Sequence, residues 1–221
     1  MTDDNDPPPV SKLTRSKERW AREGKFLTGR VARPAEQRLP PGQHLTRDWP
    51  VLDLGVTPAI GREHWRLDVH GAVEHPLFWD FAQFSAQPQQ QFISDIHCVT
   101  TWSRYDNRWD GLSTRELLAA CQPKDDAQFV VLHSHDGYTT NLTLQDFAAE
   151  DALLAHSWQG QPIERDHGGP VRLIVPHLYF WKSAKWLQRI EFVTEDKPGY
   201  WEVRGYHNRG DPWQEQRYSD D

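Results

Sequence analysis

The sequence predicts an α+β protein with a single mixed-sheet domain, short helices and much irregular chain. Segments typical of strands outnumber those typical of helices, and no helical pattern is long. Strands and helices do not alternate regularly, which argues against a doubly wound parallel sheet. The sequence has no internal repeat and neither of the common glycine-rich phosphate loops. We therefore expect the body of this 221-residue chain to fold around one core.

The chain is expected to divide into a basic, polar N-terminal arm, residues 1–38, and one folded domain, residues 39–221. The arm has few apolar residues, no sustained period and one short helix, expected around Ser16–Glu23. Residues 11–38 hold nine Lys and Arg against three Asp and Glu, whereas residues 39–221 hold 16 against 26. Turn residues cluster at Leu39–Gly42, where the domain is expected to begin.

The first half of the domain predicts two strands and one short helix. Polar and apolar residues alternate over Trp65–Val69, which is typical of a strand. Asp80 can cap a short helix over Phe81–Phe84. The apolar, β-branched run Phe92–Val99 predicts the second strand, which carries Cys98 near its end and gives way to a polar loop.

The second half predicts two helices and four strands. The four residues Ser113–Glu116 match a capping box, which begins a helix that continues to Cys121. A further short helix is expected between Thr143 and Glu150. The four strands are predicted over Phe129–Leu132, Tyr138–Leu144, Val171–Val175 and Trp186–Val193.

Composition and charge exclude several classes of protein. No apolar run approaches the roughly 20 residues that a membrane helix needs. The net charge of −7 argues against nucleic acid as a partner, and the basic arm is more typical of a solvated tail than of a nucleic-acid or lipid contact. Two cysteines cannot form a disulfide framework and suit a reducing compartment. The start MTDDNDPPPV lacks the pattern of an export signal, so we expect a cytoplasmic protein.

Cys98 is the sharpest candidate for chemistry. It lies where an apolar strand meets a polar, aromatic and cationic segment that ends at Arg104. Reactive groups are often carried by such segments on a rigid scaffold, and nearby cations favour the thiolate that attacks or binds metals. The alternative is a small buried hydrophobe, which is our interpretation of Cys121.

Two further clusters indicate anion binding. His167 and Arg172 lie five residues apart around a Gly-Gly-Pro bend, where the backbone can approach a ligand and the Arg fork can bind phosphate. Lys182, Ser183 and Lys185 suggest a second site made of backbone and ammonium groups. In the alternative interpretation, Arg172 lies on a solvated strand face and the lysines extend past core aromatics.

His133 and His135 offer a different kind of site. Residues i and i+2 of a strand share a face, so these two side chains together with Cys98 could hold zinc or iron. The sequence contains no CxxC or HExxH motif that would support this alternative.

Taken together, these segments resemble the sulfite oxidase-type molybdopterin-binding family, and most closely its compact bacterial members with the molybdenum domain alone. The segment from His97-Cys98 through Arg104 and Asn107 to Trp109-Asp110-Gly111-Leu112-Ser113 resembles the family's molybdenum-ligand loop. The segments His167–Arg172 and Lys182–Leu187 resemble its pterin-phosphate motifs. The similarity runs from about Leu39 to Tyr218 and implies the family's fold with a molybdenum–molybdopterin cofactor.

The resemblance also implies roles for individual residues. Cys98 would be the metal ligand and a catalytic residue, because a soft thiolate suits a redox-active metal. Tyr206, in the segment Trp201–Tyr206, and Arg104 would orient the substrate. The implied cofactor contacts are Thr46, Arg47, His97, His133, His167, Arg172, Ser183, Ala184 and Lys185, of which Thr46 and Arg47 belong to an N-terminal strap.

The implied activity is oxygen-atom transfer between molybdenum and a small sulfur- or nitrogen-oxide substrate. The segment Val99–Ser103 has fewer cations than sulfite oxidases carry there, so a sulfoxide-like substrate is favoured slightly over sulfite. Electrons would pass to or from a separate partner, and the oligomeric state stays open. A cofactor-binding module without turnover, and a zinc or iron enzyme built on His133, His135 and Cys98, are the alternatives.

Overall fold

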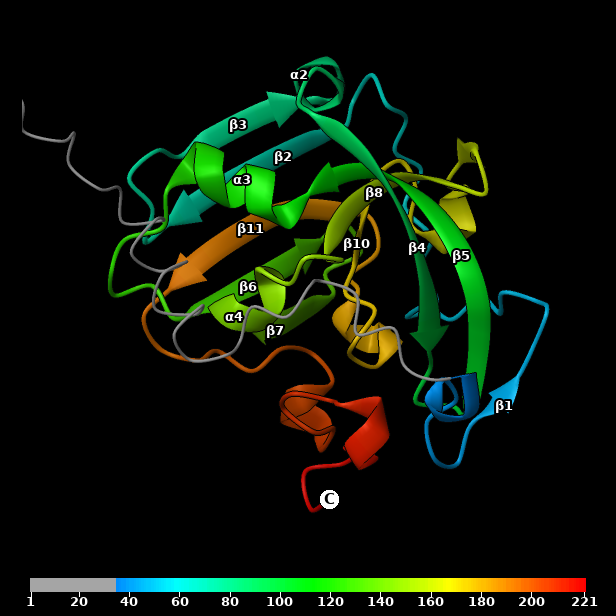
Figure 1. The fold of residues 1–221 in the computed structure, drawn as a ribbon. Helices are drawn as coiled ribbons and strands as arrows, with labels where there is room; N and C mark the ends of the chain where they lie inside the picture. The colour runs from blue at the N-terminus through cyan, green and yellow to red at the C-terminus, as the bar shows by residue number, and fades with distance from the viewer. Residues whose placement is uncertain (1–34) are drawn as a thin grey trace, which may run out of the picture. The chain divides into compact units, whose positions relative to one another are not determined.

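The computed structural model describes residues 35–221, which form two mixed β-sheets (Figure 1). The first sheet has the order β1-β5-β8-β10, with β4 paired to β5 and β9 paired to β8. Its strands are β1 (His44–Leu45), β4 (Gln89–His97), β5 (Trp102–Ser113), β8 (Leu153–Trp158), β9 (Gln161–Pro162) and β10 (Arg172–Ile174). Only β1 and β5 pair in parallel there.

The second sheet has the order β3-β2-β11-β6-β7. Its strands are β2 (Arg66–Gly71), β3 (Leu77–Asp80), β6 (Phe129–Ser134), β7 (Thr139–Thr143) and β11 (Leu187–Val193). The pair β2–β11 is parallel, and the other pairs are antiparallel. The prediction of a mixed-sheet α+β domain is confirmed.

Short helices connect these strands. The α-helices are α2 (Phe81–Ser85), α3 (Thr114–Cys121) and α4 (Leu144–Phe147), and the 3₁₀ turns are η1 (Ala35–Gln37), η2 (Arg165–His167), η3 (Phe180–Lys182), η4 (Glu202–Arg204) and η5 (Pro212–Gln214). Asp80 caps α2 in a full capping box with Gln83. The cap of α3 differs from the prediction, because the Ser113 hydroxyl accepts from Arg115 N at 3.3 Å rather than from Glu116.

The predicted strand Phe92–Val99 is confirmed as β4, but it ends at His97, so Cys98 follows the strand. The predicted loop after Cys98 is wrong beyond Thr101, because β5 begins at Trp102 and continues for 12 residues. This strand is held by β4 on one side and by β8 and β1 on the other. This long-range pairing fixes the positions of the polar side chains of β5. A local sequence pattern does not show such pairing.

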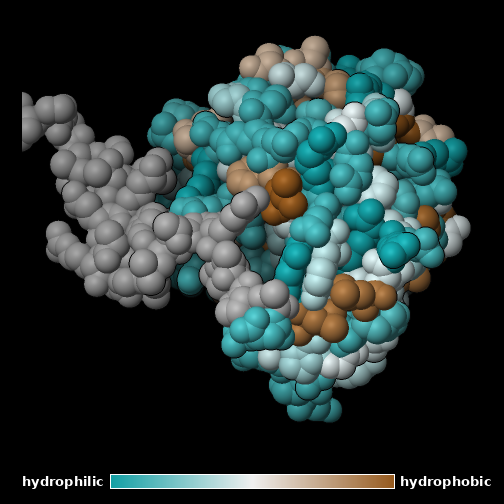
Figure 2. All heavy atoms as spheres, turned by 45° about the vertical axis from the view of Figure 1, so that its right-hand side comes forward, coloured by the Kyte–Doolittle hydropathy of each residue, from teal (hydrophilic) through white to brown (hydrophobic). Residues whose placement is uncertain are grey.

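An aromatic core lies where β4 and β5 meet β8 and β10. The buried members of this cluster are Ile96, Cys98, Trp102, Trp109, Leu153, Ala155, Ile163 and Ile174, and Trp49 and Phe180 pack against them. Aromatic side chains here bury large areas close to the candidate thiol. In contrast, the face in Figure 2 is mostly hydrophilic, with apolar residues in separate small patches.

The end of the predicted arm contacts the domain where it enters the described part. Arg38 donates to the Asp95 carboxylate of β4 at 2.5 Å. The predicted helix around Ser16–Glu23 lies outside the described residues. Within residues 35–221, no helix combines the length and apolar character required to cross a membrane.

Candidate active site

Cys98 lies in the tight connection between β4 and β5. Cys98 N donates to Trp102 O at 2.8 Å, and Thr101 N donates to Cys98 O at 3.0 Å. The side chain is buried, with its Sγ 3.1 Å from the Thr100 hydroxyl. Burial raises the pKa of the Cys98 thiol, although the Thr100 hydrogen bond and the charge of Arg217 oppose this rise. A buried thiol is unreactive by itself, whereas a bound metal would hold it as thiolate.

The predicted strap, Thr46 and Arg47, lies beside the Cys98 turn. His44 N donates to Thr101 O at 2.8 Å, and Thr46 N donates to Ser103 O at 2.9 Å, as β1 pairs in parallel with β5. Gln43 Nε2 also donates to Cys98 O at 3.0 Å. The structure therefore brings the strap and the thiol together.

Arg172 forms the most unusual feature of the site. Its side chain is fully buried and donates to the carbonyls of His167 at 2.7 Å and Ser183 at 2.8 Å. Burial lowers the pKa of Arg172 to about 9, with no carboxylate of residues 35–221 compensating. A buried cation without a counter-charge is costly, so this position suits an anionic ligand.

Two more basic side chains, Lys185 and His167, converge on Arg172 because two glycines let the chain approach closely. A Cβ on Gly168, whose φ is +99°, would lie 2.8 Å from Lys185 Cβ, and one on Gly169 would lie 2.1 Å from Ile163 O. Burial lowers the pKa of Lys185 to about 8, and Arg172 adds to this effect. Burial and the charges of Arg172 and Lys185 lower the pKa of His167 to about 4.

Ser183 and Ala184 lie in the same region but act through the backbone. Ser183 O accepts from Arg172, and Ser183 Oγ accepts from Val175 N at 2.9 Å. Ala184 is buried, and its carbonyl accepts from Leu173 N at 2.9 Å. The structure thus brings the second predicted motif against the first.

An aromatic residue outside the predicted set covers this cationic cluster. The Trp49 ring stacks on His167 with 3.8 Å between centroids, and it also contacts Trp158 and Phe180. The sequence signal available was its place two residues after Arg47 of the strap. Its contact with His167 links the strap to the Gly-Gly bend.

These residues fit a phosphate-bearing cofactor that carries a soft metal. Within residues 35–221, the buried nitrogens His167 Nδ1 and Trp102 Nε1 have no hydrogen-bond partner. Buried polar atoms are normally paired, so such atoms suit a ligand. The Arg172 and Lys185 cations, with the neutral His167 ring beside them, suit an anion, and the free Cys98 thiol suits a metal that prefers sulfur.

The two remaining predicted cofactor contacts lie differently. His97 is buried, and its Nδ1 is 2.8 Å from Ser103 Oγ, directly beside the Cys98 turn. His133 lies on β6 in the other sheet, where its ring nitrogens contact Glu191 at 3.3 Å and Arg189 at 3.0 Å. Its contact with the cofactor stays a prediction.

The alternative zinc or iron site is wrong for the described chain. His133 lies on β6 of the second sheet, whereas Cys98 follows β4 of the first. Residues 35–221 contain no group of three His, Cys, Asp or Glu side chains able to hold a metal ion. Moreover, β6 ends at Ser134 and His135 lies in the following turn, so the two histidines do not share a strand face.

The predicted ammonium site at Lys182 is also wrong. Lys182 is completely buried, with its Nζ 2.5 Å from Glu202 Oε1 and 3.0 Å from Asn141 O. A charge that is already paired inside the core is not available to an anion. Of the two lysines in this motif, only Lys185 lies in the cationic cluster.

Tyr206 reaches the site from the C-terminal segment, residues 199–221. Its ring contacts Trp181, Trp201 and Tyr218 at 5.0–5.7 Å between centroids. Burial raises the pKa of Tyr206, and the charges of Tyr218 and Cys98 raise it further. The role of Tyr206 toward the substrate stays a prediction.

Arg104 has partners on the strap side of the site. It lies on β5, donates from Nε to Arg47 O at 3.1 Å and from Nη1 to Asn107 Oδ1, and lies over the Trp158 ring. Its contact with the substrate stays a prediction. The charge that acts on the Cys98 thiol is instead that of Arg217, which the sequence analysis missed.

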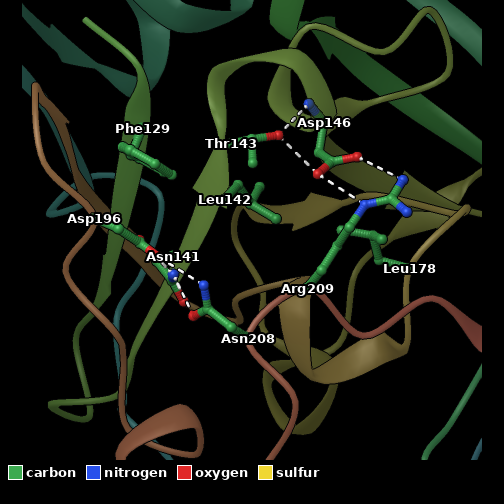
Figure 3. A pocket seen from close by; sticks show the side chains of 9 residues that line it. All are labelled: Phe129, Asn141, Leu142, Thr143, Asp146, Leu178, Asp196, Asn208 and Arg209. Carbon is green, nitrogen blue, oxygen red and sulfur yellow. Dashed lines mark hydrogen bonds and ion pairs between the residues drawn. The ribbon is translucent and has the colours of Figure 1, made fainter. Parts of the chain in front are cut away.

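The C-terminal segment is fastened to the domain at a small polar pocket (Figure 3). Arg209 binds the buried Asp146 carboxylate at 3.2 Å, and Asn141 binds Asn208 at 2.9 Å. Figure 3 shows these side chains directed toward one another across the pocket. Because its polar groups pair with each other, we interpret this pocket as an anchor that fixes the segment carrying Tyr206.

The fold and the site together define a molybdopterin-binding oxidoreductase. Residues 54–201 match the family of the oxidoreductase molybdopterin binding domain, so the chain belongs to this family. It is 48% identical over 183 residues to the uncharacterized oxidoreductase YuiH of Bacillus subtilis, covering 82% of this chain and 92% of that protein. The resemblance to sulfite oxidase-type proteins and the cofactor that it implies, molybdenum with molybdopterin, are confirmed.

Similarity to further relatives covers less of each protein. The chain is 28% identical over 172 residues to the catalytic subunit MsrP of a protein-methionine-sulfoxide reductase of Campylobacter jejuni, covering 67% of this chain and 56% of that protein. It is 30% identical over 144 residues to the putative protein-methionine-sulfoxide reductase subunit YedZ1 of Azospira oryzae, covering 65% and 54%. The sulfane dehydrogenase SoxCD of Paracoccus pantotrophus shares the fold, with a TM-score of 0.58 and 18% identity over 63% of this chain and 40% of that chain.

Proposed function

We propose that this protein transfers an oxygen atom to or from a small sulfur- or nitrogen-oxide substrate, with reduction of a sulfoxide-like substrate as the favoured direction. The observation that carries the proposal is the buried, free Cys98 thiol in the turn beside the strap, together with the buried Arg172 guanidinium that has no carboxylate partner among residues 35–221. The relatives named as protein-methionine-sulfoxide reductases support the sulfoxide-like class.

Each part of the site has a role in this proposal. When bound, the cofactor supplies the two-electron oxygen-atom transfer. Cys98 would hold the metal, and Arg172, Lys185 and His167 would hold the anionic part of the cofactor. Because its pKa is raised, Tyr206 keeps its proton and can donate a hydrogen bond to the substrate oxygen. Electrons are exchanged with a separate partner protein.

The proposed location is the cytoplasm. Both cysteines are free and buried, which fits a reducing compartment where thiols persist. Fractionation of cells that express the full chain tests this part of the proposal, and recovery of the protein outside the cytoplasm would contradict it.

The function is tested by making the full chain in cells that synthesise the cofactor. We expect the wild type to contain molybdenum and pterin and to reduce an aryl sulfoxide with an artificial electron donor. Cys98→Ser should lose molybdenum and turnover, whereas Cys121→Ala, the matched control, should keep both because Cys121 is buried in α3. Wild-type protein free of molybdenum and pterin, or full loading and activity in Cys98→Ser, would contradict the proposal. Full loading without turnover would favour the binding-module alternative.

A further inference from the structure

Arg217 is the charged residue that reaches the Cys98 turn from the far end of the chain. Its Nη1 donates to Val99 O at 2.7 Å, immediately after the thiol residue. Its guanidinium also lies over the Tyr179 ring, 5.0 Å from the centroid, and its Nη2 is 3.4 Å from Pro41 O. It thus joins the strap, the Cys98 turn and the C-terminal segment.

The same segment holds Arg217 and Tyr206 on one local scaffold. Tyr206 and Tyr218 form an antiparallel β-bridge, and His207 N donates to Arg217 O at 3.2 Å. The charge of Arg217 lowers the pKa of the Cys98 thiol, and the charge of Cys98 raises the pKa of Tyr206. The segment therefore carries two polar groups of different chemistry, a phenol and a guanidinium, and the guanidinium contacts the residue that follows Cys98.

The Arg217 guanidinium keeps donors for a ligand. An arginine side chain carries five N–H donors, and the two carbonyl contacts engage only part of this fork. Arg217 is half-buried, and it forms no ion pair with a carboxylate of residues 35–221. The Glu215 carboxylate also lies near the guanidinium, so Arg217 offers its remaining N–H donors in partly buried surroundings, where a charged hydrogen bond is stronger than in water.

We propose that Arg217 is the specificity-determining cation of the Cys98 site, which binds the negatively polarised oxygen of a small oxyanion or S-oxide substrate next to Tyr206. The inference deepens the proposed function and rests on it for the identity of the reaction. In this inference, a residue of the C-terminal segment binds the negative charge of the substrate, whereas Arg104 contacts the strap and Trp158. A substrate with a localised negative charge should bind better than an uncharged one of the same size.

The first test measures binding of inorganic sulfate to the loaded protein, from the change that sulfate causes in the Mo(V) EPR spectrum. We expect Arg217→Gln to weaken this binding roughly tenfold or more, because a hydrogen bond to a charged group is lost. The sulfate affinity of Arg217→Lys, which keeps the charge but not the forked guanidinium, should lie between those of the wild type and Arg217→Gln. The matched control is Arg204→Gln, which removes a cation of the same segment whose contacts are with Tyr200.

The second test needs no cofactor and therefore separates this inference from the proposed function. In the full-length Cys121→Ala chain made without cofactor, Cys98 is the sole thiol, and its alkylation rates with anionic iodoacetate and neutral iodoacetamide are compared. The ratio of the two rates cancels any change in the thiol pKa. We expect Arg217→Gln, but not Arg204→Gln, to lower the ratio several-fold, and added salt to lower it in the parent chain.

Three outcomes would overturn the inference. One is an unchanged sulfate affinity and alkylation ratio in Arg217→Gln, and another is an equal effect of Arg204→Gln. The third outcome matters if Arg217→Gln fails to fold. A folded Arg217→Lys chain that has lost the anion preference completely would then overturn the inference, because the lysine keeps the positive charge. Protein that never acquires molybdenum contradicts the proposed function alone, because the alkylation ratio still decides the role of Arg217.

Discussion

Lys182 Nζ and Glu202 Oε1 lie 2.5 Å apart, and their side chains are 0% and 1% exposed. Lys182 belongs to the motif that carries Ser183 and Lys185, whereas Glu202 begins the turn that ends before Tyr206. The Glu202 oxygen also accepts from Trp181 Nε1 at 3.0 Å. A buried ion pair therefore links the cofactor motif to the segment that carries Tyr206.

Breaking this ion pair should be expensive, because the remaining charge would stay buried. We expect Lys182→Met to lower the free energy of unfolding by about 3–5 kcal/mol. Glu202→Gln, which keeps an acceptor for Trp181, should also destabilise the protein. The double variant should lose less than the sum of the two, and urea unfolding of all four proteins measures this coupling. Strictly additive losses would show that the two charges do not depend on each other.

The sequence predicts those elements of the fold that local chemistry determines. Asp80 followed by Gln83 forms a capping box, and α2 begins where the pattern predicts it. In contrast, β5 is polar and aromatic over Trp102–Asn107, and the strand conformation of this part depends on pairing with β4 and β1. Elements of this kind become apparent only once their partner strands are in place.

The site shows the same division. The motifs that contain Cys98, His167 and Lys185 can be found in the sequence from their residue patterns. The structure brings His167 and Lys185 together around Arg172. The contacts of Trp49 with His167 and of Arg217 with Val99 join segments more than 100 residues apart. The local sequence does not show these contacts, because they depend on tertiary packing. Lys182 is the opposite case. It belongs to a motif that the sequence identifies, but its charge is paired with Glu202 inside the core.

Arg172 should determine how well the protein retains its cofactor. We expect Arg172→Gln to lower the pterin and molybdenum content several-fold, because the buried cation that suits an anion is lost. Arg172→Lys should recover only part, since an ammonium cannot reproduce the fork that bonds the His167 and Ser183 carbonyls. Pterin released per chain is the measurement, with Arg66→Gln as control. Full pterin content in Arg172→Gln would exclude this role.

Asp146 should fix the C-terminal segment through the anchor in Figure 3. Burial raises the pKa of Asp146, but hydrogen bonds from His177 and Arg209 outweigh this and hold it well below its usual range. Because the pKa of Asp146 is lower in the folded than in the unfolded state, the carboxylate stabilises the fold at pH values above its unfolded pKa. This stability is lost as the pH falls toward the folded pKa. Asp146→Asn should therefore destabilise the protein by roughly 1–3 kcal/mol.

The functional consequence of Asp146→Asn should appear in the segment itself. We expect faster proteolysis after residue 199 and a lower kcat, because Tyr206 loses its fixed position. Arg209→Gln, whose side chain is 42% exposed, should show a smaller effect on both measurements. If proteolysis of the segment is as slow in Asp146→Asn as in the wild type, the pocket is not the anchor.

His167 should make stability depend on pH in the cofactor-free chain. Burial, Arg172 and Lys185 lower its pKa to about 4, below the usual value of 6.5, so the unfolded state binds more protons between these values. Stability should therefore be complete above pH 6.5 and fall as the pH decreases toward 4. Since the ring is only half-buried, solvent screening reduces the expected loss to about 1 kcal/mol. His167→Phe keeps a ring against Trp49 and should lack this part of the decline in urea unfolding between pH 7 and 4.5. An identical decline in both proteins would assign the pH dependence to other groups, with His133 and His156, whose pKa values burial also lowers, as the next to examine.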